Sequence, residues 1–113
     1  MQVNLKESGM STSINKFDAL ERLIFEEGLR IQTIDIHKDL DLMLVVLNTK
    51  AILHQKISAH PKLRDASAEH LLQYELTAGG SGIHWPLLDE DLSLKGFLQD
   101  ELRALVKKGN IAA

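Results

Sequence analysis

The fifteen residues from position 79 to position 93 constrain the fold of this chain more than any other stretch. They hold three glycines, the only tryptophan, one of the two prolines and three adjacent acidic residues. Glycine permits backbone conformations that other residues avoid, proline fixes the backbone, and acidic side chains favour the first turn of a helix. The stretch therefore predicts a glycine-rich turn, a rigid Trp85-Pro86 step and an acidic approach to a final helix.

The composition is that of an ordinary single domain. With 113 residues, 44% hydrophobic and 26% charged, the chain can fill one core but not two. The net charge is −3 and the basic residues are dispersed, which argues against direct nucleic-acid binding. The absence of cysteine excludes disulfides and thiolate metal sites. No apolar run approaches the roughly 20 residues that span a bilayer, and we expect a cytoplasmic protein without membrane contact.

The chain divides into a disordered extension (residues 1–13), one α+β domain (residues 14–109) and a frayed tail (residues 110–113). Apolar residues at helical spacing predict that the domain opens with a helix over residues 15–27. Ser13 or Asn15 is the expected N-cap, because a short polar side chain can accept a free backbone N–H there. Gly28 is expected to end the helix by adopting a left-handed conformation.

Three strands are predicted next, over residues 30–37, 42–47 and 51–57. Short polar breaks separate them, so they should form a three-stranded antiparallel meander. The middle strand is apolar on both faces, with Leu42, Leu44 and Val46 on one and Met43, Val45 and Leu47 on the other. Because both faces are apolar, each must be shielded from water by another element or by another chain. Helices of this chain could lie on both sides, or one face could dock a partner or a second copy.

The second half predicts a short helix after Pro61, a short strand pair and a C-terminal helix. Ser67 should cap the short helix, with Leu71 and Leu72 pointing inward. The strands, residues 74–76 and 82–85, flank the glycine turn. The last helix should cover residues 94–108, with Ser93 as cap and Gly109 as stop. Its expected apolar stripe consists of Leu94, Phe97, Leu98, Leu102 and Leu105.

Three candidate sites in this region have a simpler structural interpretation. The glycine loop leads into extended chain and not directly into a helix, which favours a turn over phosphate binding. His84 is near Asp89, Glu90 and Asp91 and could act as a base, but only Ser81 and Ser93 offer a nucleophile, by proximity alone. The acidic residues could bind a hard cation, yet helix electrostatics already explain acids at this place.

One run of residues resembles the signature of the domain-of-unknown-function 2442 family. The matching positions are Gly82, Ile83, His84, Trp85, Pro86, Leu88, Asp89, Glu90, Asp91 and Ser93. Upstream, the meander, Pro61 and the Tyr74-Glu75-Leu76 step are also similar to that family. The chain departs from it at the hairpin turn, where Asn48-Thr49-Lys50 replaces Asn-Gly or Asp-Gly, and at Ala59-His60, where relatives often carry aromatics.

The resemblance implies a small α+β domain without established enzyme activity or cofactor. Some relatives are fused to helix-turn-helix domains and others are encoded in pairs that resemble toxin–antitoxin modules. We therefore expect a non-enzymatic protein-interaction or regulatory module, antitoxin-like, that binds a protein partner or forms a homodimer. The signature residues would be structural or partner-binding. The alternative is a small-ligand-binding protein or enzyme centred on His84 and the Asp89-Glu90-Asp91 cluster.

Overall fold

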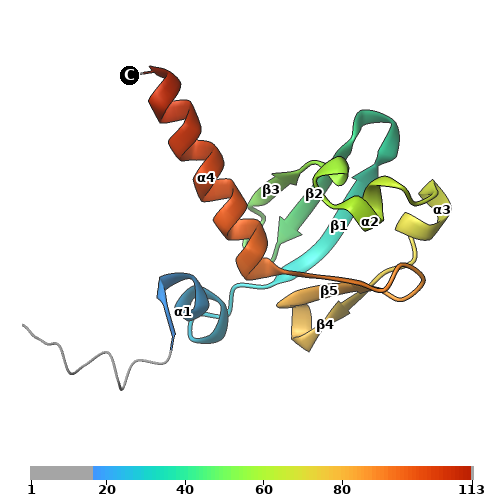
Figure 1. Cartoon of the computed structure of the whole chain (residues 1–113). Coiled ribbons are helices and arrows are strands. Elements are labelled where there is room, and N and C mark those ends of the chain that lie inside the picture. Colours follow the sequence, from blue (N-terminus) through green and yellow to red (C-terminus); the bar gives the residue numbers. More distant parts are fainter. Residues whose placement is uncertain (1–16, 113) are drawn as a thin grey trace, which may run out of the picture.

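The computed structural model describes residues 17–112, and side chains within residues 17–107 (Figure 1). The predicted extension over residues 1–13 lies outside this range. Helices (α), 3₁₀ helices (η) and strands (β) follow in this order: α1 (Ala19–Phe25), β1 (Ile31–His37), η3 (Lys38–Leu40), β2 (Leu42–Leu47), β3 (Ile52–Gln55), η4 (Ile57–Ala59), α2 (Pro61–Arg64), α3 (Ala68–Leu71), β4 (Glu75–Thr77), η5 (Ala78–Gly80), β5 (Gly82–Trp85), β6 (Glu90–Ser93) and α4 (Leu94–Ala112). The predicted α+β class is confirmed.

Helix α1 is shorter than predicted and begins after Asp18. The Asp18 carboxylate accepts a hydrogen bond from the Glu21 N–H at 2.8 Å, and the Glu21 carboxylate accepts one from the Asp18 N–H at 3.0 Å. This reciprocal capping box satisfies free N–H groups at the helix start, so Asp18, not Ser13 or Asn15, is the N-cap of the observed helix. Both of those residues lie outside the described part. Gly28 follows the helix with a φ of 82°, as the sequence predicts.

An ion pair fastens α1 to the start of α4. Lys95 Nζ lies 2.7 Å from an Asp18 carboxylate oxygen and 3.3 Å from a Glu21 oxygen. The hydrogen bond from Lys95 holds the pKa of Asp18 below its ordinary value, and the bond to Asp18 raises the pKa of Lys95. Because Asp18 also caps α1, one carboxylate positions both helices.

The first sheet is the predicted meander, in the order β1-β2-β3 with antiparallel pairing. Its second turn keeps a regular register without an Asn-Gly pair: the Leu47 N–H donates to the Ala51 carbonyl at 2.9 Å, and Lys50 takes the left-handed position with φ 77°. Asn48 adds a further constraint. Its side chain donates to the Gly28 carbonyl at 2.9 Å and accepts from the Arg30 N–H at 3.0 Å. The turn is therefore held by the linker between α1 and β1.

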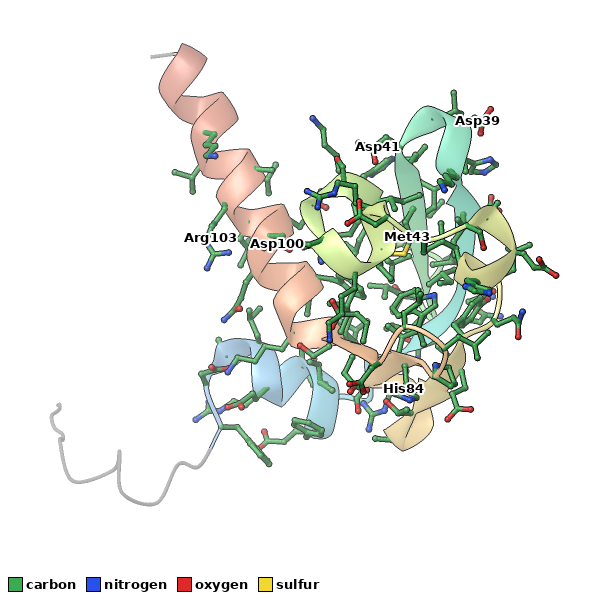
Figure 2. All side chains as sticks on the ribbon, turned by 45° about the vertical axis from the view of Figure 1, so that its right-hand side comes forward. Asp39, Asp41, Met43, His84, Asp100 and Arg103 are labelled. Carbon is green, nitrogen blue, oxygen red and sulfur yellow. The ribbon has the colours of Figure 1, made fainter. Side chains whose placement is uncertain are left out.

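The two faces of β2 differ in their environment. Met43 and Val45 are fully buried and Leu47 is 2% exposed, so this face forms the centre of the core. Figure 2 shows Met43 inside the molecule. The opposite face, formed by Leu42, Leu44 and Val46, is only half-buried and is not among the side chains packed against the core. The chain's own helices therefore cover one face of this sheet.

Two short helices replace the single one predicted after Pro61. Helix α2 buries Leu63, and α3 begins at the predicted cap, where Ser67 Oγ accepts a hydrogen bond from the His70 N–H at 3.1 Å. Leu71 is buried as predicted. Leu72 is 64% exposed, so its predicted inward position is wrong. The helix ends at Leu71, and Leu72, the residue after it, does not reach the core.

The second sheet contains the predicted strand pair and one further strand, in the order β4-β5-β6. Its inward side chains, Ile83 and Trp85, join the core together with Leu94 and Phe97 of α4. Helix α4 starts at the predicted residue, but its predicted stop at Gly109 is wrong, because the helix continues to Ala112. A glycine within a helix costs only about 1 kcal/mol relative to alanine and does not by itself end it.

The apolar stripe predicted on α4 is covered only at its beginning. Leu94 and Phe97 are buried, whereas Leu102 is 50% exposed and Leu105 is 57% exposed. Figure 1 shows the reason: the helix extends away from the body of the molecule. None of the helices within residues 17–112 combines the length and apolar composition that crossing a membrane requires.

Candidate functional site

The signature residues on β5 alternate between the core and the surface. Ile83 and Trp85 point inward, and Trp85 has no exposed surface. The indole N–H of Trp85 donates to the Leu71 carbonyl at 3.0 Å, and the Tyr74 ring lies 6.2 Å away, centroid to centroid. A buried indole needs such a partner, because an unpaired buried donor is costly. The Trp85 side chain therefore joins the second sheet to α3.

A tight turn connects Trp85 to β6. The Leu88 N–H donates to the Trp85 carbonyl at 3.1 Å, which closes the turn over Pro86 and the exposed Leu87. Asp89 takes a left-handed conformation with φ 49°. Lys62 Nζ donates to the Asp89 carbonyl at 2.7 Å and so ties the turn to α2.

The acidic residues precede α4, as the sequence predicts, but two of them lie in a strand, β6, that the sequence analysis did not predict. Glu90 and Asp91 belong to β6, where Glu90 pairs with Trp85 and Asp91 with His84 in the antiparallel register. Pairing with β5 satisfies the backbone of β6, and this tertiary effect outweighs the low strand propensity of acidic residues. Ser93 alone caps α4, accepting a hydrogen bond from the Gly96 N–H at 3.0 Å.

His84 and Asp91, which both belong to the signature, form a pair at the surface of the second sheet. His84 Nδ1 lies 2.8 Å from an Asp91 carboxylate oxygen, and Glu75 is the cross-strand neighbour of His84 on β4. The three side chains form a row across the second sheet; Figure 2 shows His84 at its surface. An adjacent carboxylate can orient an imidazole for proton transfer, so the pair contains two members of a general-base arrangement.

The nucleophile that this arrangement would need is not in place. Ser81 Oγ donates to the Ala78 carbonyl at 3.2 Å, and Ser93 Oγ is occupied by the helix cap. A hollow of about 180 Å³ beside the start of α4 is lined by His60, Asp91, Leu92, Ser93, Gly96, Phe97 and Asp100. Neither His84 nor Ser81 lines it. Within the part of the chain that the structure describes, no three potential metal ligands gather.

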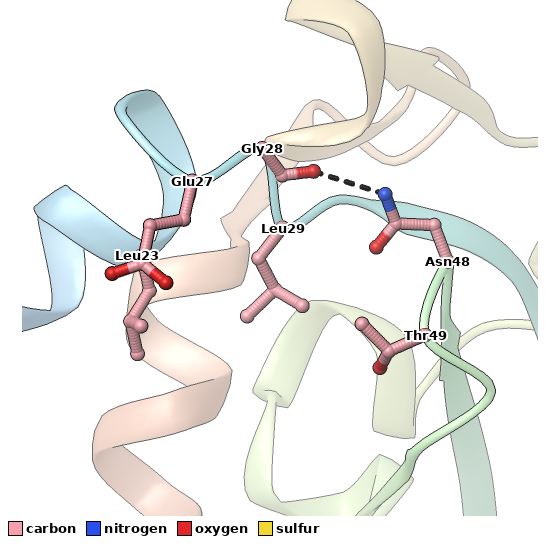
Figure 3. Close-up of a pocket in the computed structure, with 6 residues that line it drawn as sticks. All are labelled: Leu23, Glu27, Gly28, Leu29, Asn48 and Thr49. Carbon is pink, nitrogen blue, oxygen red and sulfur yellow. Dashed lines mark hydrogen bonds between the residues drawn. The ribbon is translucent and has the colours of Figure 1, made fainter.

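A second hollow, of about 240 Å³, lies between the end of α1 and the turn after β2 (Figure 3). Its walls are Leu23, Glu27, Gly28, Leu29, Asn48 and Thr49. The Asn48 side chain crosses it to the Gly28 carbonyl, and its other atoms hold the Arg30 backbone. The amide therefore serves the α1–β1 linker, and the hollow contains no acid–base pair with a nucleophile.

Replacing Ser93 by alanine should lower the free energy of unfolding by about 0.5–2 kcal/mol, the usual effect of losing an N-cap side chain. The reason is that the Gly96 N–H at the start of α4 would lose its hydrogen-bond acceptor in the variant. Urea unfolding followed by circular dichroism would measure it. Ser81→Ala is the control, because the Ser81 hydroxyl bonds only the nearby Ala78 carbonyl. An equal loss in both variants would contradict the capping role.

Within residues 17–107, two apolar surfaces remain partly exposed. One is the outer sheet face, which we define as Leu42, Leu44, Val46 and Ile52; Ile52 is 47% exposed. The other is the distal stripe of α4, which we define as Leu98, Leu102, Leu105 and Val106; Val106 is 64% exposed. The sequence predicted that β2 is apolar on both faces. Helical periodicity alone did not reveal that the distal stripe of α4 would remain exposed to solvent.

Comparisons with known proteins agree with the fold. A crystal structure of a protein of unknown function from Rhodospirillum rubrum is similar, with 26% identity, a TM-score of 0.57, and coverage of 64% of this chain and 87% of that one. The solution NMR structure of an uncharacterized protein from Chromobacterium violaceum shares the fold at 19% identity, with a TM-score of 0.60, and coverage of 85% of this chain and 84% of that one. No curated protein matches the sequence.

The sequence profile of the family described as "Protein of unknown function (DUF2442)" matches residues 31–101. The match takes in both sheets, the short helices and the beginning of α4. Helix α1 and the last eleven residues of α4 lie outside it. This range covers more than half of the sequence and includes all of the signature. The chain belongs to the domain-of-unknown-function 2442 family.

Proposed function

We propose that this protein is a non-enzymatic, regulatory protein-interaction module, antitoxin-like, that binds a protein partner through the outer sheet face. The observation that carries the proposal is the incomplete burial of one face of β2. Leu42, Leu44 and Val46 are half-buried by their strand neighbours and remain outside the core, and Ile52 on β3 is 47% exposed. Removing such surface from water is favourable by roughly 25 cal/mol per Å². A protein partner would supply that cover.

The surroundings of the outer sheet face suit a protein partner. In the register of the sheet, Leu44 lies between Asp35 and His54, and Val46 lies between Thr33 and Ile52. An apolar centre with a polar, solvent-accessible rim is the usual anatomy of a protein–protein interface. His37 Nε2 lies 2.9 Å from an Asp35 oxygen, so part of the rim is already ordered before binding.

The alternative, a ligand-binding protein or enzyme centred on His84, has the His84–Asp91 pair in its favour. The hydroxyls of Ser81 and Ser93 are engaged in other hydrogen bonds, and the hollow beside the start of α4 is lined by Asp91 but not by His84. Proton transfer to a bound substrate needs a reacting atom within hydrogen-bond distance of the base. The exposed Asp91, with 74% of its side-chain surface accessible, leaves this pair open to water. The outer sheet face therefore supports the interaction function better.

The test compares Leu44→Lys with Leu72→Lys. Both replace a leucine by lysine, whose long stem can retain apolar contact, so both variants should fold. Leu72 is 64% exposed on α3 and lies outside the outer sheet face. Tagged wild type and both variants would be used to capture proteins from the native host. We expect at least one protein bound by wild type and Leu72→Lys but lost from Leu44→Lys.

The captured protein would then be purified and titrated calorimetrically against all three forms. The proposal requires at least about a tenfold weaker affinity for Leu44→Lys, which corresponds to about 1.4 kcal/mol. If every captured protein binds Leu44→Lys as well as wild type, the outer sheet face is not the interface. A small molecule that copurifies with wild type and is lost from His84→Ala would support the ligand-binding alternative.

A further inference from the structure

We propose that the partner of the outer sheet face is a second copy of this chain, with the two sheets face to face about a two-fold axis parallel to β2. This pairing rests on the proposed function, because it names the occupant of the same surface. Leu42, Leu44 and Val46 are half-buried and lie outside the core, and Ile52 is 47% exposed. The polar residues beside them indicate which molecule fits.

The charged residues of the outer sheet face are arranged in a self-complementary row. In the register of the sheet, Leu44 pairs with Asp35 on β1 and with His54 on β3. Cross-strand neighbours point to the same side of a sheet, so all three side chains lie on the outer face. Asp35 and His54 are both exposed. The row therefore has an acid at one end, a leucine in the middle and a basic side chain at the other end.

A two-fold axis parallel to β2 places this row on its own reverse. The rotation keeps each residue at its level along the strands and exchanges the outer strands, so β1 of one copy faces β3 of the other. Leu44 then meets Leu44 of the second copy, and Asp35 meets His54 of the second copy once on each side of the axis. Packed sheets commonly align their strands in this way, about 10 Å apart. Such an interface is closed and ends at the dimer.

Both members of the Asp35–His54 pair are available for this contact. His37 Nε2 lies 2.9 Å from Asp35 Oδ2, which leaves Asp35 Oδ1 free to accept, and 59% of the Asp35 side-chain surface is accessible. Within residues 17–107, no hydrogen bond or ion pair engages the His54 ring. An imidazole N–H can donate to a carboxylate in either protonation state of the ring. Hydrogen bonds to a charged acceptor are roughly twice as strong as neutral ones.

The same residues disfavour the other symmetric arrangement of two facing sheets. A two-fold axis that runs across the strands at the level of Leu44 would place Asp35 against Asp35 and His54 against His54. Like charges placed opposite each other at an interface are unfavourable, and complementary charges fix register and orientation. The charge pattern therefore selects the axis parallel to β2.

Sedimentation equilibrium of the full chain tests the pairing. The face spans strands of seven, six and four residues, so we expect a weak dimer with a dissociation constant of roughly 10–100 micromolar. Leu44→Lys should raise that constant by roughly 100-fold or more, because two ammonium groups then meet at the axis. Leu72→Lys is the control, since Leu72 is 64% exposed outside the outer sheet face. Circular dichroism would show that both variants retain the fold.

A charge exchange tests the axis. Asp35→Lys and His54→Glu should each weaken self-association severalfold at low salt, because each variant faces a like charge on its copy. An equimolar mixture of the two should recover at least the wild-type affinity, since its mixed dimer contains one exchanged pair and one native pair. With the axis across the strands, neither single change would weaken the dimer, and that result would refute the proposed axis. Weakening without recovery in the mixture would refute the Asp35–His54 contact.

The result also separates this pairing from the proposed function. A wild-type monomer at high micromolar concentration, or a dimer that Leu44→Lys leaves unchanged, would refute the pairing. If a captured protein still loses affinity for Leu44→Lys in that case, the proposed function stands with a different partner. A dimer that Leu44→Lys dissociates supports the pairing, even where no other protein distinguishes the variants.

Discussion

Replacing Trp85 by alanine should lower the free energy of unfolding by about 3–5 kcal/mol, the range for truncating a large buried aromatic side chain. Trp85 has no exposed surface and packs near Tyr74 in the centre of the core. Its removal leaves a cavity and also leaves the Leu71 carbonyl without its donor. Urea unfolding followed by far-ultraviolet circular dichroism would measure the loss, since the variant lacks the only tryptophan.

Trp85→Phe separates the two contributions. It keeps an aromatic ring but removes the N–H that bonds Leu71, so its loss should lie well below that of the alanine variant. Leu87→Ala is the control, because Leu87 lies in the same signature and is 56% exposed. If Trp85→Ala unfolds at the wild-type urea concentration, the signature is a binding surface and not part of the core.

The sequence predicted the first sheet well because its information is local. Residues 31–37, 42–47 and 52–55 carry β-branched or alternating apolar side chains, and polar breaks of hairpin length separate them. The exact turn was less predictable. Lys50 has a φ of 77°, a conformation that glycine adopts more readily, and Asn48 compensates with bonds to the α1–β1 linker. That linker is close in space but distant in sequence.

Strand β6 was missed for a related reason. Acidic residues are unfavourable in strands and favourable at helix starts, so Glu90 and Asp91 predicted a helix approach. In the fold, their backbone pairs with β5, and Asp91 faces His84. The alternation of the outward Asp91 and Ser93 with the half-buried Glu90 and Leu92 was the available signal. Four residues are too few for period-two alternation to outweigh composition.

The candidate surfaces were predictable as patterns but not as exposed areas. The two-faced β2 was evident from alternation, yet only the fold establishes that Met43 faces the core while Leu44 does not. Likewise, Leu102 and Leu105 continue a helical stripe whose first members, Leu94 and Phe97, are buried. Periodicity identifies which side chains share a face. What covers that face depends on where the helix leaves the body.

Replacing Gly80 by alanine should lower the free energy of unfolding by about 2–5 kcal/mol. Gly80 is buried and has a φ of 104°, which an alanine adopts only under strain. A Cβ at this position would lie 2.6 Å from the Ile31 carbonyl oxygen and 3.2 Å from Arg30 Cβ. The obstacle is the backbone at the start of β1, which cannot move aside as a side-chain end can, so overpacking adds to the conformational strain.

Gly79→Ala is the matched control for Gly80→Ala. Its φ of 69° is also left-handed, but a Cβ there meets nothing within 4 Å, so the expected loss is only the conformational term of about 1–2 kcal/mol. Thermal and urea unfolding of both variants would measure the difference, with equal denaturant slopes as the sign of an unchanged unfolded state. The sequence identifies both glycines as turn residues and does not distinguish them. If the two variants lose the same stability, the close approach of Gly80 to Ile31 does not add to the cost of a side chain at position 80.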